Sequence, residues 1–269
     1  MENDKILLFI PMYNCEKQIP RVLEKLALWE DAGEHLGGVL VVDNRSADGS
    51  VRAAEEGIRT LSVPAMVVRN DDNYGLGGSH KVAFSYALDH GFRGVIVLHG
   101  DDQGDVRDII PFLSEAERWD SMLGSRFSRG SRLYNYSKFR IFGNHVFNAL
   151  FSAVTGRRVE DLGSGLNYYS TSYLASGFYL PFPNDLTFNV YLLLYGIHSG
   201  SRFRFFPLSW REEDQVSNAR FMKQSKRMLG LMGQYLFSRK KLFSQRENEY
   251  SRIRYTFQVA AENGQEGTK

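Results

Sequence analysis

The chain has 269 residues, 43% of them apolar, and carries 33 Lys and Arg against 31 Asp and Glu. This length allows one large domain with a sizeable core, and the near balance of charge argues against a dedicated nucleic-acid binder. A single cysteine, Cys15, excludes an intrachain disulfide and fits a reducing cytosol. A secretory signal and an apolar run of roughly 20 residues are both lacking. We therefore expect a cytoplasmic protein, soluble or peripheral on the inner face of the membrane.

The first half of the chain alternates between strand-like and helix-like segments. Short apolar, β-branched runs predict strands at 6–10, 39–42, 66–68 and 95–98, with helical patterns at 17–29, 50–56 and 77–90. Near-continuous apolar strands separated by helices predict an α/β fold with a mostly parallel sheet covered on both faces. In such a sheet the ligand lies at the carboxyl ends of the strands, so the residues after each strand are the candidate site.

The second half is less regular. Helical patterns occur at 105–118, 140–155 and 185–198, and strand-like runs at 122–124 and 202–207. Arginines with interleaved aromatic residues run from Arg126 to Arg140. Because guanidinium forks match phosphate geometry, this stretch is a candidate phosphate site, with a solvated basic loop as the alternative.

Each of the four predicted strands ends in a polar, acidic or Gly-rich turn. The fourth turn reads His99-Gly100-Asp101-Asp102-Gln103. In an extended segment, His99, Asp101 and Gln103 would point the same way. Carboxylate and amide oxygens suit Mg²⁺, whereas a histidine nitrogen favours Mn²⁺. We predict a divalent-metal site around Asp101; the alternative is a turn that caps the next helix.

Six short motifs, four of them at these strand ends, follow one another in the order that is typical of the family-two inverting glycosyltransferases. The chain resembles this family, and within it the dolichol-phosphate mannose synthase-like group, over about the first 220 residues. The motifs begin at Pro11, Val42, Asn73, His99, Gly124 and Asp161. The resemblance implies a GT-A (Rossmann-like) fold and a glycosyltransferase that moves a sugar, with inversion, from a nucleotide-diphosphate donor carrying UDP or GDP. The implied acceptor is a polyprenyl phosphate, a lipid-linked molecule or a glycan, and the implied cofactor is Mn²⁺ or Mg²⁺.

The resemblance also implies roles for single residues. Donor binding falls to Pro11, Tyr13, Asn14, Asp43, Asn44, Asn73, Gly75 and Lys81. Acceptor or phosphate binding falls to Arg126, Arg140, Ser164 and Arg211, and metal binding to Asp101, Gln103 and His99. A hydroxyl acceptor needs a base, for which Asp161 is the first candidate and Asp185 the second. A lipid phosphate is already anionic and needs none; Asp161 would then position a donor or an arginine.

Some residues depart from the family's pattern and keep alternatives open. His99 replaces the first acid of the metal motif and Asn44 an acid of the second motif, and the lid that begins at Arg211 has neither glycine nor lysine. A non-catalytic nucleotide-sugar-binding relative therefore remains an alternative. A sugar nucleotidyltransferase is disfavoured because the turn at Pro11 has no glycine or cation. A dehydrogenase is disfavoured because Gly75 follows the third strand instead of the first.

The chain divides into three predicted segments. Residues 1–219 form the catalytic domain, with a nucleotide half at about 1–104 and an acceptor half at about 105–219; residues 220–255 form a basic amphipathic helical segment, and 256–269 a disordered tail. The helical segment places Leu229, Met232, Leu236 and Phe243 on one stripe. This stripe could lie in a membrane interface, or pack on the catalytic domain or on a second copy in a homo-oligomer.

Overall fold

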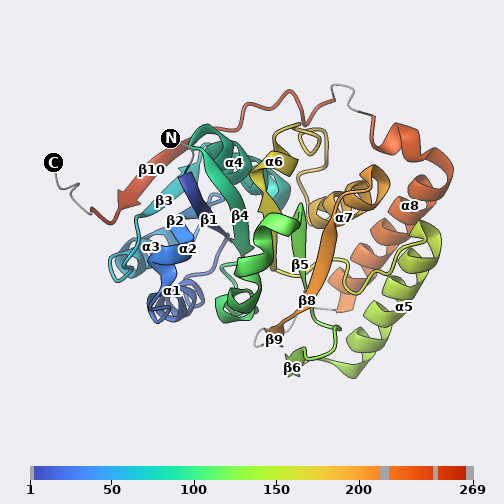
Figure 1. The fold of residues 1–269 in the computed structure, drawn as a ribbon, viewed down its shortest axis with the longest axis horizontal. Helices are drawn as coiled ribbons and strands as arrows, with labels where there is room; N and C mark the ends of the chain where they lie inside the picture. Colours follow the sequence, from blue (N-terminus) through green and yellow to red (C-terminus); the bar gives the residue numbers. More distant parts are fainter. Residues whose placement is uncertain (1–2, 213–217, 245–247, 265–269) are drawn as a thin grey trace.

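The computed structural model describes residues 3–212, 218–244 and 248–264. An eight-stranded sheet in the order β10-β3-β2-β1-β4-β7-β5-β8 runs through the molecule, and β6 pairs separately with β9 (Figure 1). The strands are β1 Asn3–Met12, β2 Leu36–Asp43, β3 Ala65–Asn70, β4 Phe92–Leu98, β5 Ser121–Ser125, β6 Arg132–Tyr134, β7 Leu166–Ser170, β8 Phe203–Pro207, β9 Ser209–Arg211 and β10 Phe257–Glu262. The helices are α1 Ile19–Ala27, α2 Ala32–His35, α3 Ser50–Ile58, α4 Gly75–Asp89, α5 Lys138–Thr155, α6 Thr171–Leu174, α7 Phe188–Ser199 and α8 Asn218–Leu242, with 3₁₀ helices η1 Val106–Asp108 and η2 Ile110–Arg118.

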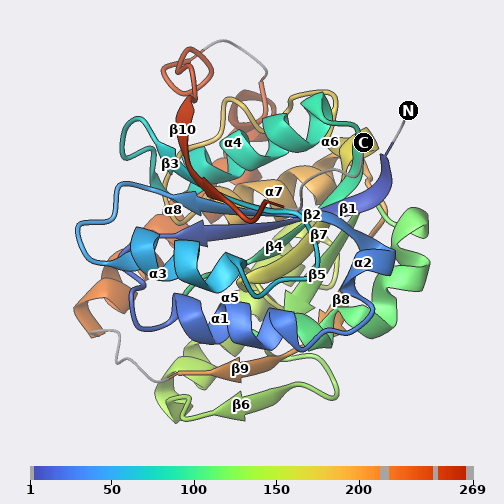
Figure 2. The same ribbon diagram turned by 90° about the vertical axis from the view of Figure 1, so that its left-hand side faces the viewer.

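The four predicted strands of the first half form a parallel core in the order β3-β2-β1-β4. Ile6, Leu8 and Ile10 of β1 belong to one hydrophobic cluster, and Leu7 and Phe9 belong to the other. Helices α1 and α3 lie on one face of the sheet and α4 on the opposite face (Figure 2). Strands buried on both faces need apolar residues at every position, so the predicted α/β sheet is confirmed.

The antiparallel strand β7 joins the two halves of the chain. It lies between β4 and β5 and pairs antiparallel with both. Its sequence, Leu-Asn-Tyr-Tyr-Ser, has no apolar, β-branched run, so sequence patterning did not predict it. Through β7 the nucleotide half and the acceptor half share one sheet.

The segment at 105–118 does not form the α-helix that its periodicity predicts. It forms the 3₁₀ helices η1 and η2. The Asp105 side chain accepts a hydrogen bond from Arg107 N at 3.0 Å and begins the first one. Pro111 lies in the first turn of η2 and has no N–H group with which to continue a helix from η1. The residues after the metal motif are thereby held in tight turns.

The C-terminal segment crosses the molecule and completes the opposite edge of the sheet. After α8 the chain returns to β3, where β10 pairs antiparallel (Figure 1). The Asn263 amide donates to Ile58 O at 3.0 Å and Val63 O at 2.9 Å, and its oxygen accepts from Ala65 N at 2.7 Å. The prediction of a disordered tail from residue 256 is therefore wrong for β10. Its side chains are largely exposed, and an edge strand held by backbone pairing leaves little hydrophobic pattern.

Helix α8 packs on the catalytic domain, and its buried stripe is offset by one residue from the predicted stripe. Met228, Leu231 and Tyr235 are buried, whereas Leu229 and Leu236 are exposed. Phe243, predicted on the same stripe as Leu229 and Leu236, is buried instead of exposed, and non-helical backbone at Ser238 accounts for this change of face. Within the described residues, every helix is too short or too polar to span a bilayer.

Candidate functional site

The carboxyl ends of the parallel strands surround a cavity of about 560 Å³, a size typical of small-molecule sites. Its lining consists of Pro11, Met12, Tyr13, Cys15, Asn44, Asn73, Gly75, Leu76, Ser79, His99, Gly100, Asp101, Asp185 and Leu186. We call this cavity the donor pocket. Five of the eight donor-binding residues expected from the resemblance line it, namely Pro11, Tyr13, Asn44, Asn73 and Gly75.

One wall of the donor pocket is a network of amides. Asn44 Nδ2 donates to Asn73 Oδ1 at 2.8 Å, and Asn44 Oδ1 accepts from Asn70 Nδ2 at 3.1 Å and from Tyr74 N at 2.9 Å. Asn73 Oδ1 also accepts from Gly75 N at 3.1 Å. Asparagine at position 44 supplies both a donor and an acceptor, whereas a carboxylate would only accept. Asn44, which replaces the family's acid, thus links the turn after β2 to the turn after β3.

Glycine is required at position 75. Gly75 has φ +71°, and a Cβ atom there would overlap the carbonyl oxygen of Asn184. The backbone of Asn184 also accepts a hydrogen bond from Gly77 N at 2.8 Å. The loop before α7 is therefore held against the start of α4, and this contact sets one side of the donor pocket.

Asp43 and Asn14 lie outside the lining of the donor pocket, and their expected contact with the nucleotide stays a prediction. The fully buried Asp43 carboxylate accepts from Ser46 N at 3.1 Å and lies 3.3 Å from the Arg69 guanidinium. Asn14, at φ +52°, accepts from Ala47 N at 2.9 Å. The oxygens of both side chains accept hydrogen bonds within the turn that carries Asn44.

Lys81 is likewise turned away from the donor pocket. Its ammonium donates to Phe182 O at 2.6 Å, Asn184 Oδ1 at 2.8 Å and Tyr255 Oη at 3.2 Å. Burial lowers the pKa of Lys81 to about 7. This buried amine links α4, the loop before α7 and the C-terminal segment, and its expected contact with a phosphate stays a prediction that these contacts disfavour.

The metal motif divides between two cavities. Asp102 has φ +59°, so the segment is not extended and the expected alternation fails. Asp101 lines the donor pocket, whereas Gln103 lines a different cavity of about 220 Å³. The Asp102 carboxylate lies 2.6 Å from both Arg21 Nε and Lys25 Nζ. Asp101 is therefore the motif carboxylate that faces the donor, and Gln103 is corrected as a ligand in the same pocket.

His99 faces the donor pocket with one edge and the core with the other. The rings of His99 and His80 lie 6.2 Å apart in a T-shaped arrangement, and the Nε2 atom of each is buried without a hydrogen-bond partner within the described residues. Burial lowers the pKa of both, that of His80 to about 3. Burial thus disfavours the protonated form of His99, which lines the same pocket as Asp101.

The described residues contain no group of three or more His, Cys, Asp and Glu side chains that could hold a metal by themselves. Asp101 and Asp185 are the acids on the donor-pocket wall. A cation bound through one or two carboxylates and the phosphates of its substrate fits this donor set. A closed metal site built by the protein alone does not.

A second cavity of about 200 Å³ adjoins the donor pocket, and Leu186 lines both. Its lining consists of Arg126, Tyr136, Arg140, Asn144, Phe147, Leu162, Gly163, Leu186, Val190, Ser225 and Met228. We call it the arginine pocket. Two of the predicted phosphate-binding residues, Arg126 and Arg140, therefore meet next to the donor site, with apolar side chains around them.

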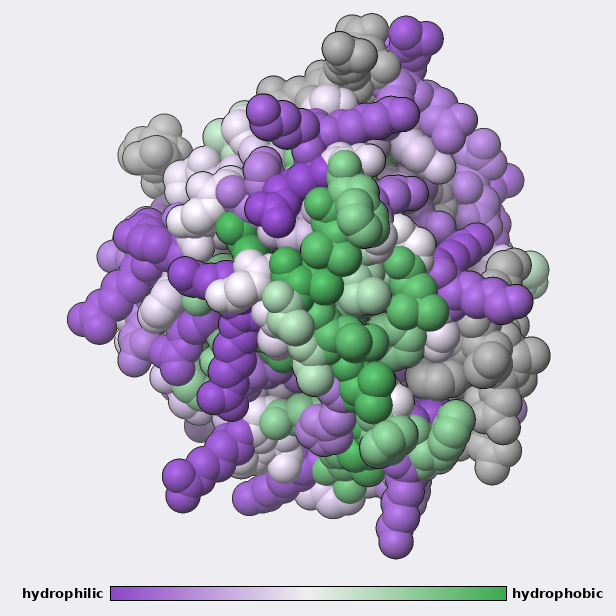
Figure 3. All heavy atoms as spheres, turned by 90° about the vertical axis from the view of Figure 1, so that its right-hand side faces the viewer, coloured by the Kyte–Doolittle hydropathy of each residue, from purple (hydrophilic) through white to green (hydrophobic). Residues whose placement is uncertain are grey.

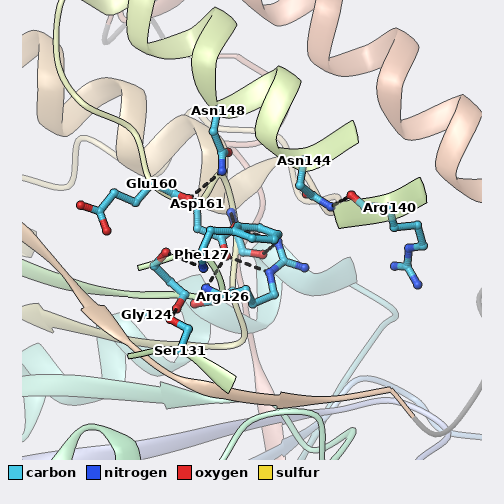
Figure 4. Close-up of polar contacts among 12 residues, drawn as sticks. Gly124, Arg126, Phe127, Ser131, Arg140, Asn144, Asn148, Glu160 and Asp161 are labelled. Carbon is cyan, nitrogen blue, oxygen red and sulfur yellow. Dashed lines mark hydrogen bonds and ion pairs between the residues drawn. The ribbon is translucent and has the colours of Figure 1, made fainter. Parts of the chain in front are cut away.

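Arg126 is held rigidly by Asp161 (Figure 4). Nε and Nη2 of Arg126 donate to the two carboxylate oxygens at 2.8 and 2.7 Å, and Arg126 N donates to Asp161 Oδ2 at 2.9 Å. Burial opposes the charge of Arg126, but the Asp161 carboxylate outweighs it and raises the pKa of the guanidinium. Because Asp161 is buried and fully paired, the structure favours its other expected role, that of positioning an arginine, and its role as catalytic base stays a prediction.

Arg140 Nη1 forms an ion pair with Glu212, and Arg140 Nε is buried without a hydrogen-bond partner in the described residues. Ser164 is buried and donates to Leu166 O at 3.1 Å, so it does not face a phosphate as expected. Arg211 lies in the cavity with Gln103, its guanidinium 5.4 Å from the Tyr134 ring. The expected acceptor contact of Arg211 is therefore not in the arginine pocket. Residues 213–217 of the predicted lid lie outside the described residues.

Two site residues had no signal in the sequence. Leu186 separates the two pockets, and Asn184 supports Gly75 and Lys81. Asp185, between them, lines the donor pocket and lies 3.0 Å from Arg227 of α8. Only the placement of this loop beside α4 brings these residues to the site.

Comparison with known proteins agrees with this geometry. The chain is 28% identical to undecaprenyl-phosphate 4-deoxy-4-formamido-L-arabinose transferase of Proteus mirabilis, over 62% of this chain and 49% of the relative. It is 26% identical to undecaprenyl-phosphate mannosyltransferase of Micrococcus luteus, over 61% of this chain and 66% of the relative. The chain thus spans between about half and two thirds of these relatives.

A solved structure of glucosyl-3-phosphoglycerate synthase from Mycobacterium tuberculosis, in complex with Mn²⁺, UDP and phosphoglyceric acid, superimposes with a TM-score of 0.64. It shares 14% identity, over 96% of this chain and 87% of that one. This likeness confirms the expected GT-A-like fold. A model of the family described as "Glycosyl transferase family 2" matches residues 8–177. With the sheet, the strand-end turns and this match together, the chain belongs to glycosyl transferase family 2.

Proposed function

We propose that this glycosyltransferase moves a sugar from a nucleotide diphosphate, UDP or GDP, to the phosphate of a polyprenyl-phosphate acceptor. The observation that carries this proposal is the contact of the two pockets at Leu186. An acid-bearing cavity at the strand ends suits a nucleotide with its cation, and a cavity with two arginines suits a second phosphate. Their contiguity lets the two substrates meet.

On the donor side, the amides of Asn44 and Asn73 and the exposed ring of Tyr13 provide the polar and stacking contacts for base and ribose. Asp101 would hold Mn²⁺ or Mg²⁺ together with the diphosphate. When bound, that cation neutralises the charge of the departing nucleotide diphosphate. His99 lines the same pocket; its role as a metal ligand stays a prediction.

On the acceptor side, Arg126 and Arg140 would bind the phosphate. A phosphate monoester is anionic at neutral pH, so no residue has to remove a proton. One acceptor oxygen forms the new bond to the sugar's anomeric carbon while the bond from that carbon to the diphosphate oxygen breaks. Attack from the side opposite the leaving group inverts the configuration. Asp161 holds the Arg126 guanidinium through Nε and Nη2 and so fixes its position on the wall of the arginine pocket.

The relatives support a phosphate-bearing acceptor. Two carry undecaprenyl phosphate in their names, and the solved synthase was crystallised with phosphoglyceric acid. The apolar side chains around the arginine pocket favour a prenyl chain over a small, soluble acid. Such an acceptor places the enzyme at a membrane, as a peripheral protein on the cytoplasmic side.

The runner-up is transfer to a hydroxyl of a lipid-linked molecule or a glycan. This reaction needs a base, and the described acids on the donor-pocket wall are Asp101 and Asp185. The Asp185 side chain is 42% exposed, and its Oδ1 accepts from Thr187 N at 2.8 Å. Asp185 is therefore the base candidate that replaces Asp161 under this reading.

The test combines binding with transfer. A thermal-shift screen of UDP, GDP and their common sugars, with Mn²⁺ and with Mg²⁺, should give one nucleotide that raises the melting temperature in a concentration-dependent way. Incubation of the matching sugar nucleotide with undecaprenyl phosphate in detergent should then yield a glycosylated lipid of inverted anomeric configuration. Transfer to glycans but not to the lipid phosphate would favour the runner-up.

A further inference from the structure

Helix α5 exposes an apolar stripe on its outer side, although Phe151 on its inner side is fully buried. Arg140, Asn144 and Asn148 recur every four residues and turn inward (Figure 4). Asn144 Nδ2 donates to Tyr136 Oη at 3.1 Å, and Asn148 Nδ2 donates to Glu160 O at 2.6 Å. The opposite side of the helix is apolar and exposed: Phe139, Phe142, Val146 and Leu150. A surface helix normally directs its apolar residues to the core and polar residues to solvent, so the exposed stripe of α5 is available to a partner outside the chain.

Helix α8 extends this apolar surface. It lies against α5, and while Met228, Leu231 and Tyr235 are buried, its outer side exposes Leu229, Leu236 and Phe237, the last with 88% exposure. We call these exposed residues of the two helices the α5–α8 face. Figure 3 shows an apolar band across this side of the molecule, bordered by hydrophilic residues. A contiguous exposed apolar patch of this kind marks an interaction site.

The charge of the two helices identifies the partner. Neither α5 nor α8 contains Asp or Glu in its sequence. Lys138, Lys226 and Lys240 are exposed on them. Apolar side chains with cations and no acids suit the interface of an anionic bilayer. A second copy of the chain on a two-fold axis would instead oppose like charges.

The arginine pocket opens between the same two helices. Arg140, Asn144 and Phe147 of α5, and Met228 of α8, line it. We propose that the α5–α8 face docks on an anionic membrane and thereby sets the arginine pocket at the level of the lipid phosphates. This inference deepens the proposed function, on which it rests: the acceptor enters from the bilayer, with its phosphate against Arg126 and Arg140 and its prenyl chain left in the bilayer.

The test uses the full chain and vesicles of phosphatidylcholine with or without phosphatidylglycerol. The double variant Phe142→Ser/Leu150→Ser removes two exposed side chains of the face, and Leu28→Ser, a residue 77% exposed at the end of α1, is the matched control. At low salt, the wild type and the control should sediment with anionic vesicles. The double variant should partition roughly tenfold less per residue changed, and high salt should weaken all binding.

Turnover separates docking from chemistry. With a short, water-soluble prenyl phosphate, the double variant should retain the kcat/KM of the wild type; with undecaprenyl phosphate in vesicles, its rate should fall as its binding does. Wild-type protein that stays in the supernatant, or a double variant that binds like the wild type, overturns the inference. So does a wild-type dimer that the double variant converts to a monomer without vesicle binding. Vesicle binding through this face without sugar transfer to either acceptor supports docking and rejects the proposed function.

Discussion

Arg126 and Asp161 form a buried, two-pronged ion pair beside the donor pocket, with 11% of the first side chain and 1% of the second exposed. The carboxylate has no remaining open side, because the Gly163 N–H also donates to it at 3.1 Å. The pair fixes the guanidinium plane, and the remaining edge of Arg126 faces the arginine pocket. Asp161 therefore acts through Arg126.

Asp161→Asn should destabilise the protein by about 3–5 kcal/mol, because it leaves a buried guanidinium without its counter-charge. It should also raise the KM for the acceptor more than that for the donor. Chemical denaturation and steady-state kinetics measure the two effects. Asp120→Asn, which breaks an exposed pair with Arg202, should cost only about 0–1 kcal/mol. A variant that loses kcat alone, at wild-type stability, would return Asp161 to the role of base.

Asp101→Ala should abolish metal-dependent transfer while the protein still melts cooperatively. The loss should exceed the roughly 10–100-fold typical of removing an outer-shell group, because Asp101 is the motif carboxylate in the donor pocket. Gln103→Ala, in the neighbouring cavity, should keep its Mn²⁺ dependence. Titration of both variants with Mn²⁺ in the presence of the nucleotide decides between them. Equal losses in the two variants would show that position 103 reaches the metal after all.

Gly75→Ala should lower stability by about 1–3 kcal/mol and weaken nucleotide binding. Two costs combine, since the residue has φ +71° and its Cβ would overlap Asn184 O. Gly156→Ala is the matched control, with φ +68° but no atom within 4 Å of its Cβ. It carries only the cost of the backbone conformation. Comparable melting temperatures and nucleotide affinities in the two variants would mean that the Asn184 contact does not shape the pocket.

Lys81 should make stability depend on alkaline pH. Its folded pKa of about 7 lies below the ordinary value of 10.5 because of burial. Between these values the unfolded chain binds more protons, so the free energy of unfolding should increase with pH, by at most about 1.4 kcal/mol per pH unit. Lys81→Met should remove this slope. Urea denaturation at pH 7 to 10 tests it, and parallel pH profiles for wild type and variant would contradict the assignment.

Local patterning was sufficient for the parallel core and for the part of the donor pocket formed by strand ends. Strands that are buried on both faces consist of apolar residues in sequence, so they can be recognised as apolar runs. The turns that follow Met12, Asp43, Asn70 and Leu98 must meet at one edge of the sheet, because the strands are parallel. For this reason Pro11, Tyr13, Asn44, Asn73 and Asp101 could be assigned to one cavity before their positions were known.

The direction and pairing of side chains were decided by tertiary structure. Whether Asp161 is a free base or a partner of Arg126 depends on two segments 35 residues apart in the chain, and Lys81 finds its acceptors 101 to 174 residues away. A single positive φ at Asp102 sends Gln103 into another cavity. In α5 the sequence alone shows a helical pattern, but only the place of the helix beside the arginine pocket turns Arg140, Asn144 and Asn148 inward. Contacts between distant segments leave no periodic signal, because each depends on one residue meeting another across the fold.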